Sequence, residues 1–524
     1  MKAKTLSDPL DRYTEIGALG AKAKAAVNRI FIPLAVVLAA ESANLYFSGK
    51  PGAVAFLMMC IGACVALKAW CTDALGLPLL PLMVLQGLVI YGIPIAFGHD
   101  VILTYPPEFV TDAGIEVLIF DLTMILAWKL AIRLFRPSPP VSFCLQEFSK
   151  AGIKGWSRLG FGMVAGATGF EVMQSLRLTE SLDSALPNGA GSILAAFVSV
   201  VSACGFFLVS LAVGANEVSV LAKAAFWSLV VINAMMSASE FLLYGVAANL
   251  ITIAIGFFWS NGRVPWPYLI VSMLSLSFLN SGKTTMRLRH WRTDDPPAPE
   301  YSFGRLPAIY AEWIRVSYDA IVEDRPAQGS GPGDSTSQDN KNQTLLDRID
   351  NLQNMLFVID ATKTEHVGLL HGATYSLIPP LLVPRILWPD KPRSHEGQVI
   401  LNVHFGRQDL NSTFATYIAW GLLAEAYGNF GPVLGSVSIG VFLGVLFAWV
   451  ENLTARKLVI SMEGFLSISL LMNLMNSFEM VASVLVTSIF QSFVIVVAAS
   501  VPFVRRTVRN LPAADGGSPS RHRD

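Results

Sequence analysis

The sequence predicts an all-α protein, a polytopic transmembrane helical bundle of about twelve spans. One large extracytoplasmic loop is expected between spans nine and ten. Of the 524 residues, 53% are hydrophobic and only 15% are charged, and the mean hydropathy is +0.52. Soluble domains carry roughly 25% charged residues, so the excess apolar surface must face lipid. The placement of Lys and Arg between the apolar segments then orients the bundle.

Twelve apolar segments approach the length of a membrane helix, which needs about 20 largely apolar residues. An N-terminal tail, residues 1–29, precedes nine segments within residues 30–280. Three more lie within residues 430–503, before a C-terminal tail, residues 504–524. Because the first tail is polar and basic, no cleavable signal peptide is expected. The predicted spans are residues 30–47, 53–70, 76–97, 114–134, 159–176, 191–213, 219–236, 240–259, 265–280, 430–449, 458–477 and 481–503.

The orientation follows from the basic residues of the short connections, which accumulate on the cytoplasmic side. They cluster in both tails, in residues 133–158, and at Arg456 and Lys457, whereas residues 98–114 contain no Lys or Arg. Twelve spans place every basic cluster inside, together with both termini. Residues 281–429 then form the large loop outside the cytoplasm.

The large loop is predicted to hold two amphipathic helices around a disordered insert. The insert, residues 326–343, is rich in Gly, Ser and Pro, which is typical of a flexible linker. Apolar residues recur at helical spacing before it, in residues 307–322, and after it, from Leu345 to Ile359. We expect both helices to lie against the membrane or the bundle. Residues 368–382 are too short and too rich in Pro and Gly for a span, which favours a re-entrant or interfacial element.

Residues 383–393, VPRILWPDKPR, form a segment that we call the elbow. Its three prolines prevent a regular helix, and it carries Arg385, Trp388 and Lys391 beside apolar residues. A cation held beside apolar surface is costly unless it meets an anion. The elbow is therefore a candidate anion clamp. Arg385 and His371 are candidate catalytic residues of the loop, and further candidates for substrate contact are Tyr375, Arg348 and Lys283.

Glu425 is the candidate general base. It lies in an apolar, helix-like run that ends at YGNFG, a sequence that should terminate the helix. Two interpretations stay open: Glu425 either hydrogen-bonds a neighbouring helix, or it accepts a proton or binds a sugar hydroxyl at the membrane surface. Tyr427 and Asn429 follow it on the same segment.

Several chemistries are disfavoured. The formal net charge is zero, so no bulk attraction to nucleic acid is expected. The segment NSGKTT lacks the first glycine of a phosphate-binding loop. The five cysteines offer no disulfide or metal-ligand spacing, and we expect neither metal nor cofactor. Without ATP or metal, the donor would have to arrive activated, and a polyprenyl-diphosphate-linked sugar fits because Arg and Lys can neutralise the leaving diphosphate.

Two segments of the loop resemble the Wzy-type O-antigen and exopolysaccharide repeat-unit polymerases. They are GATYSLIPPLLVPRILWPDKP and LLAEAYGNFG, and the resemblance covers residues 345–431. It implies a bacterial inner-membrane glycosyltransferase that moves a growing glycan from undecaprenyl diphosphate to the next lipid-linked repeat unit, on the periplasmic face and without metal. It also implies a chain-length regulator and a flippase as partners. The positions that match are Arg385, Trp388, Lys391, Glu425, Tyr427 and Asn429, whereas His371 and Arg348 are additions made from the residues alone.

Two functional alternatives remain at this point, beside a purely structural membrane scaffold, which would leave the cationic elbow unexplained. An O-antigen ligase-like transferase shares the donor and differs in the acceptor. A lipid-linked oligosaccharide flippase or another transporter would predict evenly short loops and inverted repeats. No repeat is found, and one loop dominates the chain.

Overall fold

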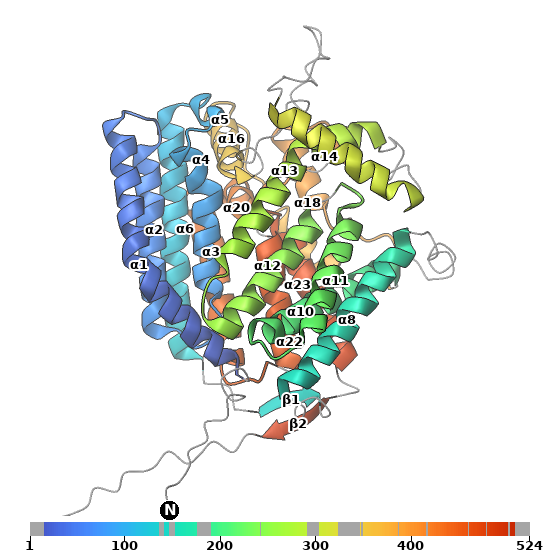
Figure 1. Ribbon diagram of the computed structural model, residues 1–524. Helices are drawn as coiled ribbons and strands as arrows, with labels where there is room; N and C mark the ends of the chain where they lie inside the picture. The colour runs from blue at the N-terminus through green and yellow to red at the C-terminus, as the bar shows by residue number, and fades with distance from the viewer. Residues whose placement is uncertain are drawn as a thin grey trace, which may run out of the picture.

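The computed structural model describes residues 15–135, 141–145, 152–175, 190–241, 243–290, 303–322, 346, 349–385, 387–415, 418–459, 461–477, 479–500 and 504–508. Within these ranges the fold is helical apart from one pair of short strands, as the all-α prediction required. Figure 1 shows the long helices packed side by side as a bundle. The insert 326–343 and Arg348 lie outside the described residues.

Each of the twelve predicted segments overlaps a helix. The first nine correspond to α1 (Ile16–Phe47), α2 (Ala53–Asp73), the run α3–η2–α4 (Leu79–Ala96), α6 (Pro107–Leu134), α8 (Gly152–Ser175), α10 (Ala190–Gly214), α11 (Val220–Ala238), α12 (Tyr244–Asn261) and α13 (Trp266–His290). The last three correspond to α21 (Leu434–Thr454), α22 (Met462–Ser477) and α23 (Ala482–Ser500).

Six of the described helices are long and apolar enough to cross a membrane. They are α1, α2, the run α3–α4, α10, α11 and α21, while α22 and α23 contain shorter apolar helices. The chain therefore has the character of a multi-pass membrane protein.

Helix α1 begins earlier than the sequence predicted. Residues 16–29, assigned to the tail, form its first half and bury Ile16, Leu19 and Ala23. The Ile16 N–H donates to the Lys457 carbonyl at 3.0 Å. The start was missed because lysines interrupt the apolar pattern there, yet packing against the α21–α22 turn holds this half of the helix in place.

The loop elements gather at one end of the bundle (Figure 1). The two predicted amphipathic helices are α14 (Leu306–Val322) and α16 (Leu352–Lys363). Residues 368–382 contain turns, the 3-10 helix η5 (Tyr375–Leu377) and the short helix α17 (Ile378–Leu382), so this segment is irregular as expected. The remaining elements at or below this end are α5 (Asp100–Leu103), η3 (Phe303–Arg305), α18 (Glu396–His404), α19 (Ser412–Ala415) and α20 (Leu422–Phe430).

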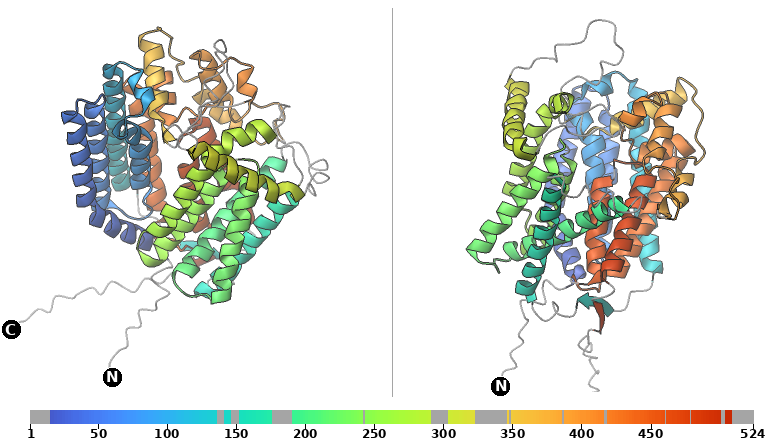
Figure 2. Two further views of the ribbon diagram at one scale, coloured as in Figure 1. Left: turned by 45° about the horizontal axis from the view of Figure 1, so that its top comes forward. Right: turned by 90° about the vertical axis from the view of Figure 1, so that its right-hand side faces the viewer.

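The opposite end joins segments that are far apart in the sequence (Figure 1, Figure 2). Strand β1 (Val141–Leu145) pairs antiparallel with β2 (Val504–Val508), with Val141 opposite Val508. Glu15 forms an isolated bridge with Leu458. These contacts bring the start of α1, the connection after α6, the α21–α22 turn and the segment after α23 to one end of the bundle.

Close packing of α6 against α2 and α21 forms the centre of the first half of the fold. Gly440 and Gly444 lie on one face of α21, and a Cβ at Gly440 would sit 2.9 Å from the Phe120 carbonyl oxygen on α6. A Cβ at Gly444 would collide with the Met124 carbonyl and lie 2.9 Å from the Ala127 Cβ. Such small residues four apart allow helices to approach closely where no water drives their association.

The approach of α21 to α6 predicts the effect of a larger residue at Gly444. We expect Gly444→Leu to lower the thermal unfolding midpoint of the detergent-purified protein, because α21 must move away from α6. The matched control is Gly166→Leu on α8, where a Cβ meets nothing within 4 Å. Equal midpoints for the two variants would contradict the packing described here.

Candidate functional site

The site is built around α20, a nine-residue helix bounded by two glycines. Gly421 and Gly431 have φ of 80° and 79°, a backbone conformation that side chains with a Cβ rarely adopt. The chain therefore turns sharply on both sides of the helix. The helix ends at Phe430 with Gly431 as its C-cap, so the YGNFG sequence ends the helix as predicted. Residues 422–429 are buried throughout.

Glu425 is fully buried on α20 and both of its carboxylate oxygens accept hydrogen bonds. The Thr374 hydroxyl donates to Oε1 at 2.6 Å. The backbone N–H of Ala482, the first residue of α23, donates to Oε2 at 2.5 Å. The first N–H groups of a helix have no partner within it and attract negative charge. Glu425 thus joins the irregular segment before the elbow to the start of α23.

The environment shifts the protonation of Glu425. Burial raises the pKa of this carboxyl to about 7, although the hydrogen bonds from Thr374 and Ala482 favour the charged form. Burial and the Glu425 charge also raise the pKa of the Tyr375 hydroxyl well above its usual value. A carboxyl with a pKa near 7 can exchange a proton at neutral pH.

Polar atoms without a hydrogen-bond partner surround Glu425. Among the described residues, Asn429 Oδ1, Tyr375 OH and Ser483 Oγ are buried and unpartnered. The Asn429 side-chain amide donates to Thr374 Oγ1 at 2.9 Å and to the Glu425 carbonyl at 2.8 Å, so it belongs to the same cluster. Unsatisfied buried polar groups are uncommon and call for a partner such as water or a ligand hydroxyl.

The two segments that carry the family resemblance contact each other through Thr374, which hydrogen-bonds Glu425 and Asn429, and the two residues just before the first segment extend this contact. The N–H of Leu370 donates to the Gly428 carbonyl at 3.0 Å, and that of His371 donates to the Asn429 carbonyl at 2.9 Å. His371 has a left-handed φ of 47°, and its side chain is exposed. The structure therefore places the backbone of His371 in the cluster and its ring at the surface.

The elbow cations bind the backbone of the elbow. Arg385 donates to the carbonyls of Pro389 at 3.1 Å and of Pro392 at 3.4 Å. Lys391 donates to the carbonyls of Leu381 at 2.8 Å and Val383 at 2.5 Å, and burial and the neighbouring Arg385 lower its pKa. Trp388 projects outward, 43% exposed. The cations close the bend, and none of these contacts joins them to Glu425.

Other predicted site residues lie elsewhere. Tyr427, two residues after Glu425, is buried near Thr362 and Lys363 of α16. Lys283 is buried on α13, where its neighbour Gly282 packs against Ser317 of α14. Of the candidates, the structure brings together Glu425, Asn429, Tyr375 and the backbone of His371.

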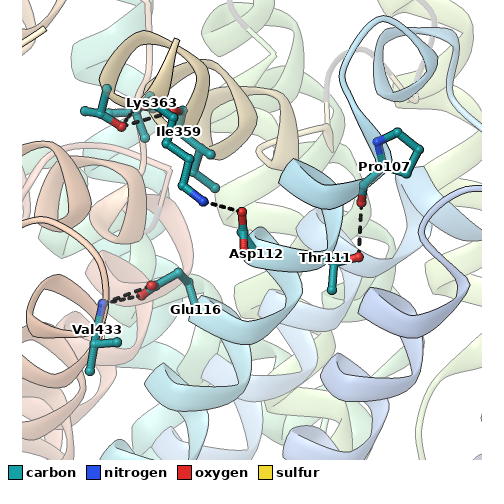
Figure 3. A network of polar contacts seen from close by, with 9 residues as sticks. Pro107, Thr111, Asp112, Glu116, Ile359, Lys363 and Val433 are labelled. Atoms are coloured by element: carbon teal, nitrogen blue, oxygen red, sulfur yellow. Dashed lines mark hydrogen bonds and ion pairs between the residues drawn. The ribbon is translucent and has the colours of Figure 1, made fainter. Parts of the chain in front are cut away.

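Sequence reasoning missed two polar contacts of α6 near the site, one with the start of α21 and one with α16. Figure 3 shows Glu116 of α6 accepting from the Val433 N–H at 2.9 Å, and it also accepts from the Ser436 hydroxyl. In the same view Lys363 of α16 pairs with Asp112 of α6 at 2.6 Å. A carboxylate inside the apolar run of residues 114–134 was the available signal for Glu116.

The sequence also gave no sign that the Arg407 guanidinium is held between aromatic rings. Its guanidinium lies 5.1 Å from the centre of the Phe357 ring and 5.9 Å from that of Trp420, and it donates to Asn354. Burial lowers its pKa. Arg407 therefore links the segment after α18 to α16 and to the chain that enters α20.

Comparisons of the chain with protein-family models, with curated proteins and with solved structures found no match.

The raised pKa of Glu425 predicts a pH-dependent stability. Its native pKa of about 7 exceeds the ordinary value of 4.5, so the native state binds the proton more tightly. The free energy of unfolding should fall by about 3 kcal/mol as the pH rises through this interval, because the native state must then hold a buried charge.

Thermal unfolding of the detergent-purified protein at about pH 5 and about pH 8 measures this loss. In Glu425→Gln, which cannot ionise at this position, the fall in stability between the two pH values should be smaller than in the wild type. In Glu365→Gln, an exposed control, the fall in stability should equal that of the wild type. An identical pH response in all three proteins would show that Glu425 does not titrate in this range.

Proposed function

We propose that the protein polymerises undecaprenyl-diphosphate-linked oligosaccharide repeat units into O-antigen or exopolysaccharide, by metal-independent glycosyl transfer at the periplasmic face of a bacterial inner membrane. The observation that carries the proposal is the contact between the two resembling segments, at a buried carboxyl with a pKa of about 7. A protonatable carboxyl beside unpartnered hydroxyl and amide groups suits the transfer of a sugar to a hydroxyl.

The arrangement of the chain supports twelve spans with both termini in the cytoplasm. The four basic clusters lie at or next to the contacts that gather at one end of the bundle, namely the start of α1, β1, the α21–α22 turn and β2. The loop helices α14 and α16 lie at the other end (Figure 1). In this topology α6, α8, α12, α13, α22 and α23 join the six apolar helices as spans, and residues 281–429 form the periplasmic loop.

In the proposed reaction Glu425 is the general base. The acceptor sugar hydroxyl gives its proton to the carboxylate as its oxygen attacks the anomeric carbon of the donor. The bond between the anomeric carbon and the diphosphate oxygen breaks as the new glycosidic bond forms, and undecaprenyl diphosphate leaves with the bonding electrons. Each Glu425 oxygen accepts one hydrogen bond and keeps a second lone pair, but the side chain is fully buried, so a neighbouring segment must move to admit the acceptor hydroxyl. The irregular backbone of residues 368–382 is the part that would move.

The leaving diphosphate requires cations. Arg385 and Lys391 remain the proposed clamp, and the elbow supplies them close together. In the described arrangement their donors point at backbone carbonyls, so the diphosphate would have to compete with those carbonyls. The donors are cationic in both cases, but only the diphosphate also carries negative charge, and its attraction to the two cations favours the exchange.

Loss of the base should stop chain growth. We expect Glu425→Gln to reduce the polymerisation rate by roughly 100-fold or more, since general-base catalysis contributes 10²–10⁴-fold. The measurement is the glycan ladder in a deletion strain that expresses the variant at the wild-type level. Glu365→Gln, an exposed carboxylate of the same loop, should restore the ladder fully. A normal ladder from Glu425→Gln would remove Glu425 from the mechanism.

The glycan of the deletion strain distinguishes the competing functions. A polymerase deletion should leave single repeat units attached to the lipid A core or exported singly. Long chains that stay on the polyprenyl carrier would instead indicate a ligase. Absence of any periplasmic product would indicate a flippase, and either of these two results would overturn the proposal.

A further inference from the structure

Asp121 lies halfway along α6 and is buried inside the bundle. It follows Pro107 by 14 residues and precedes Leu134 by 13, so about 20 Å of helix separates it from either end at a rise of about 1.5 Å per residue. The residue is 5% exposed. Helix α6 packs against α2 and α21, which are each long and apolar enough to cross a membrane (Figure 1). Asp121 therefore lies at the depth of their apolar segments.

The Asp121 carboxyl fills a place that a glycine of α2 leaves open. A Cβ at Gly62 would lie 2.6 Å from Asp121 Oδ2 and 3.1 Å from the Asp121 Cβ. Any side chain at Gly62 would therefore displace the carboxyl. Small residues commonly allow helices to approach closely within membranes, and here the approach of α2 to α6 encloses an ionisable group.

Asp121 differs from other buried carboxylates of this half of the fold because it accepts no hydrogen bond. Glu116, on the same helix, accepts from the Val433 N–H at 2.9 Å, and Glu451 of α21 accepts from the Trp128 ring N–H at 3.0 Å. Among the described residues, no N–H or O–H group donates to Asp121 and no cation lies beside it. A buried carboxylate without donors or a counter-ion is costly, whereas a protonated carboxyl carries no charge.

A tyrosine hydroxyl without a partner lies near this carboxyl. The π-helix η2 (Leu88–Gly92) separates α3 from α4, and Tyr91 within it is 1% exposed. Among the residues that the structure describes, nothing hydrogen-bonds the Tyr91 hydroxyl, and the Asp121 charge acts on it. Single π-helical turns are rare and frequently occur at functional sites. One carboxyl and one phenol without partners are therefore neighbours inside the bundle.

Other titratable groups on the elements around Asp121 have contacts of their own. Glu479 acts on the Tyr91 hydroxyl from the other side of the site. On α2, Cys60 and Cys64 lie two residues to either side of Gly62, on the opposite face of the helix. The remaining groups are paired: Lys363 with Asp112, Lys129 with Asp73, and the two bonded carboxylates Glu116 and Glu451.

The chemistry of this place suits a proton better than a metal ion. A hard cation takes about six oxygen ligands. No three His, Cys, Asp or Glu side chains gather in the described part of the chain in a way that could hold a metal. One carboxyl and one hydroxyl can instead bind and exchange a proton.

We propose that Asp121 is a proton-binding site inside the membrane. Its carboxyl holds an exchangeable proton between α2 and α6, and the Tyr91 hydroxyl is the polar neighbour that donates to the carboxylate when the proton leaves. The inference rests on the placement of α6 as a span and is independent of glycosyl transfer.

Carbodiimide labelling of the full-length protein tests the site. Dicyclohexylcarbodiimide is apolar and converts a protonated carboxyl within a bilayer to a stable N-acylurea. The protein in nanodiscs is labelled at a series of pH values from about 6 to about 9, digested, and analysed by peptide mass spectrometry. We expect adduct at Asp121 that falls several-fold as the pH rises, and little adduct at Glu116 and Glu451, the matched buried carboxylates.

Two variants sharpen the test. Asp121→Asn should remove the adduct from its peptide. In Tyr91→Phe the fall in labelling should move to higher pH, because the phenol no longer stabilises the carboxylate by donating to it. A general effect of pH on the reagent would leave the profile of this variant equal to that of the wild type.

Four results would overturn the proposal. Absence of adduct at Asp121 throughout the series would show that it holds no proton. Equal adduct at Asp121, Glu116 and Glu451 would show that burial alone explains the labelling. Protection by sodium ions at constant pH would make a metal cation the ligand, and an unchanged profile in Tyr91→Phe would remove the hydroxyl from the site. None of these results depends on glycan synthesis, so a failure here is distinct from a failure of the polymerase proposal.

Discussion

The packing of this protein depends on buried carboxylates that accept hydrogen bonds from backbone N–H groups at or just before the start of another helix, because these N–H groups have no acceptor within that helix. Three buried carboxylates have this role. Glu425 accepts from Ala482, Glu116 accepts from Val433, and the Oε1 of Glu451 accepts from Leu75 and Gly76 at 2.6 and 3.0 Å. In each case the carboxylate of one helix receives donors from the start of another segment. Leaving such a donor unpaired costs about 1–3 kcal/mol, so each contact fixes the axial position of two helices.

The same contacts give α20 its unusual character. Val433 sits at the start of α21 with a left-handed φ of 63°, and Glu116 holds it there. Gly435 packs against the backbone of Ala426, which keeps α20 against α21. The carboxyl that α20 carries is consequently both a structural acceptor and a group with a raised pKa. Glu425 can therefore have a structural role and a chemical role. The irregular segment that contains Thr374 is the element whose movement would uncover the carboxyl.

The elbow shows how prolines and cations can act together. Three prolines leave carbonyls that no regular helix would satisfy, and Arg385 and Lys391 supply the donors. The cations that a clamp would need are thus held close together by the bend itself. Trp388 and Leu387 face outward on the same elbow beside the exposed Asp390, whereas the donors of Arg385 and Lys391 turn to its backbone.

Hydropathy alone predicted where the long apolar helices lie, because each of them has a continuous run of apolar residues in the sequence. The end of α20 at YGNFG and the two amphipathic loop helices were likewise predictable from local pattern. Tertiary structure decided what local pattern cannot encode: that residues 16–29 are helical, that β1 pairs with β2, and that the elbow cations turn inward. It also chose the partners of Glu425, since Thr374 and Ala482 lie 51 and 57 residues away along the chain. Only the folded chain brings such distant donors within hydrogen-bonding distance of one buried carboxylate.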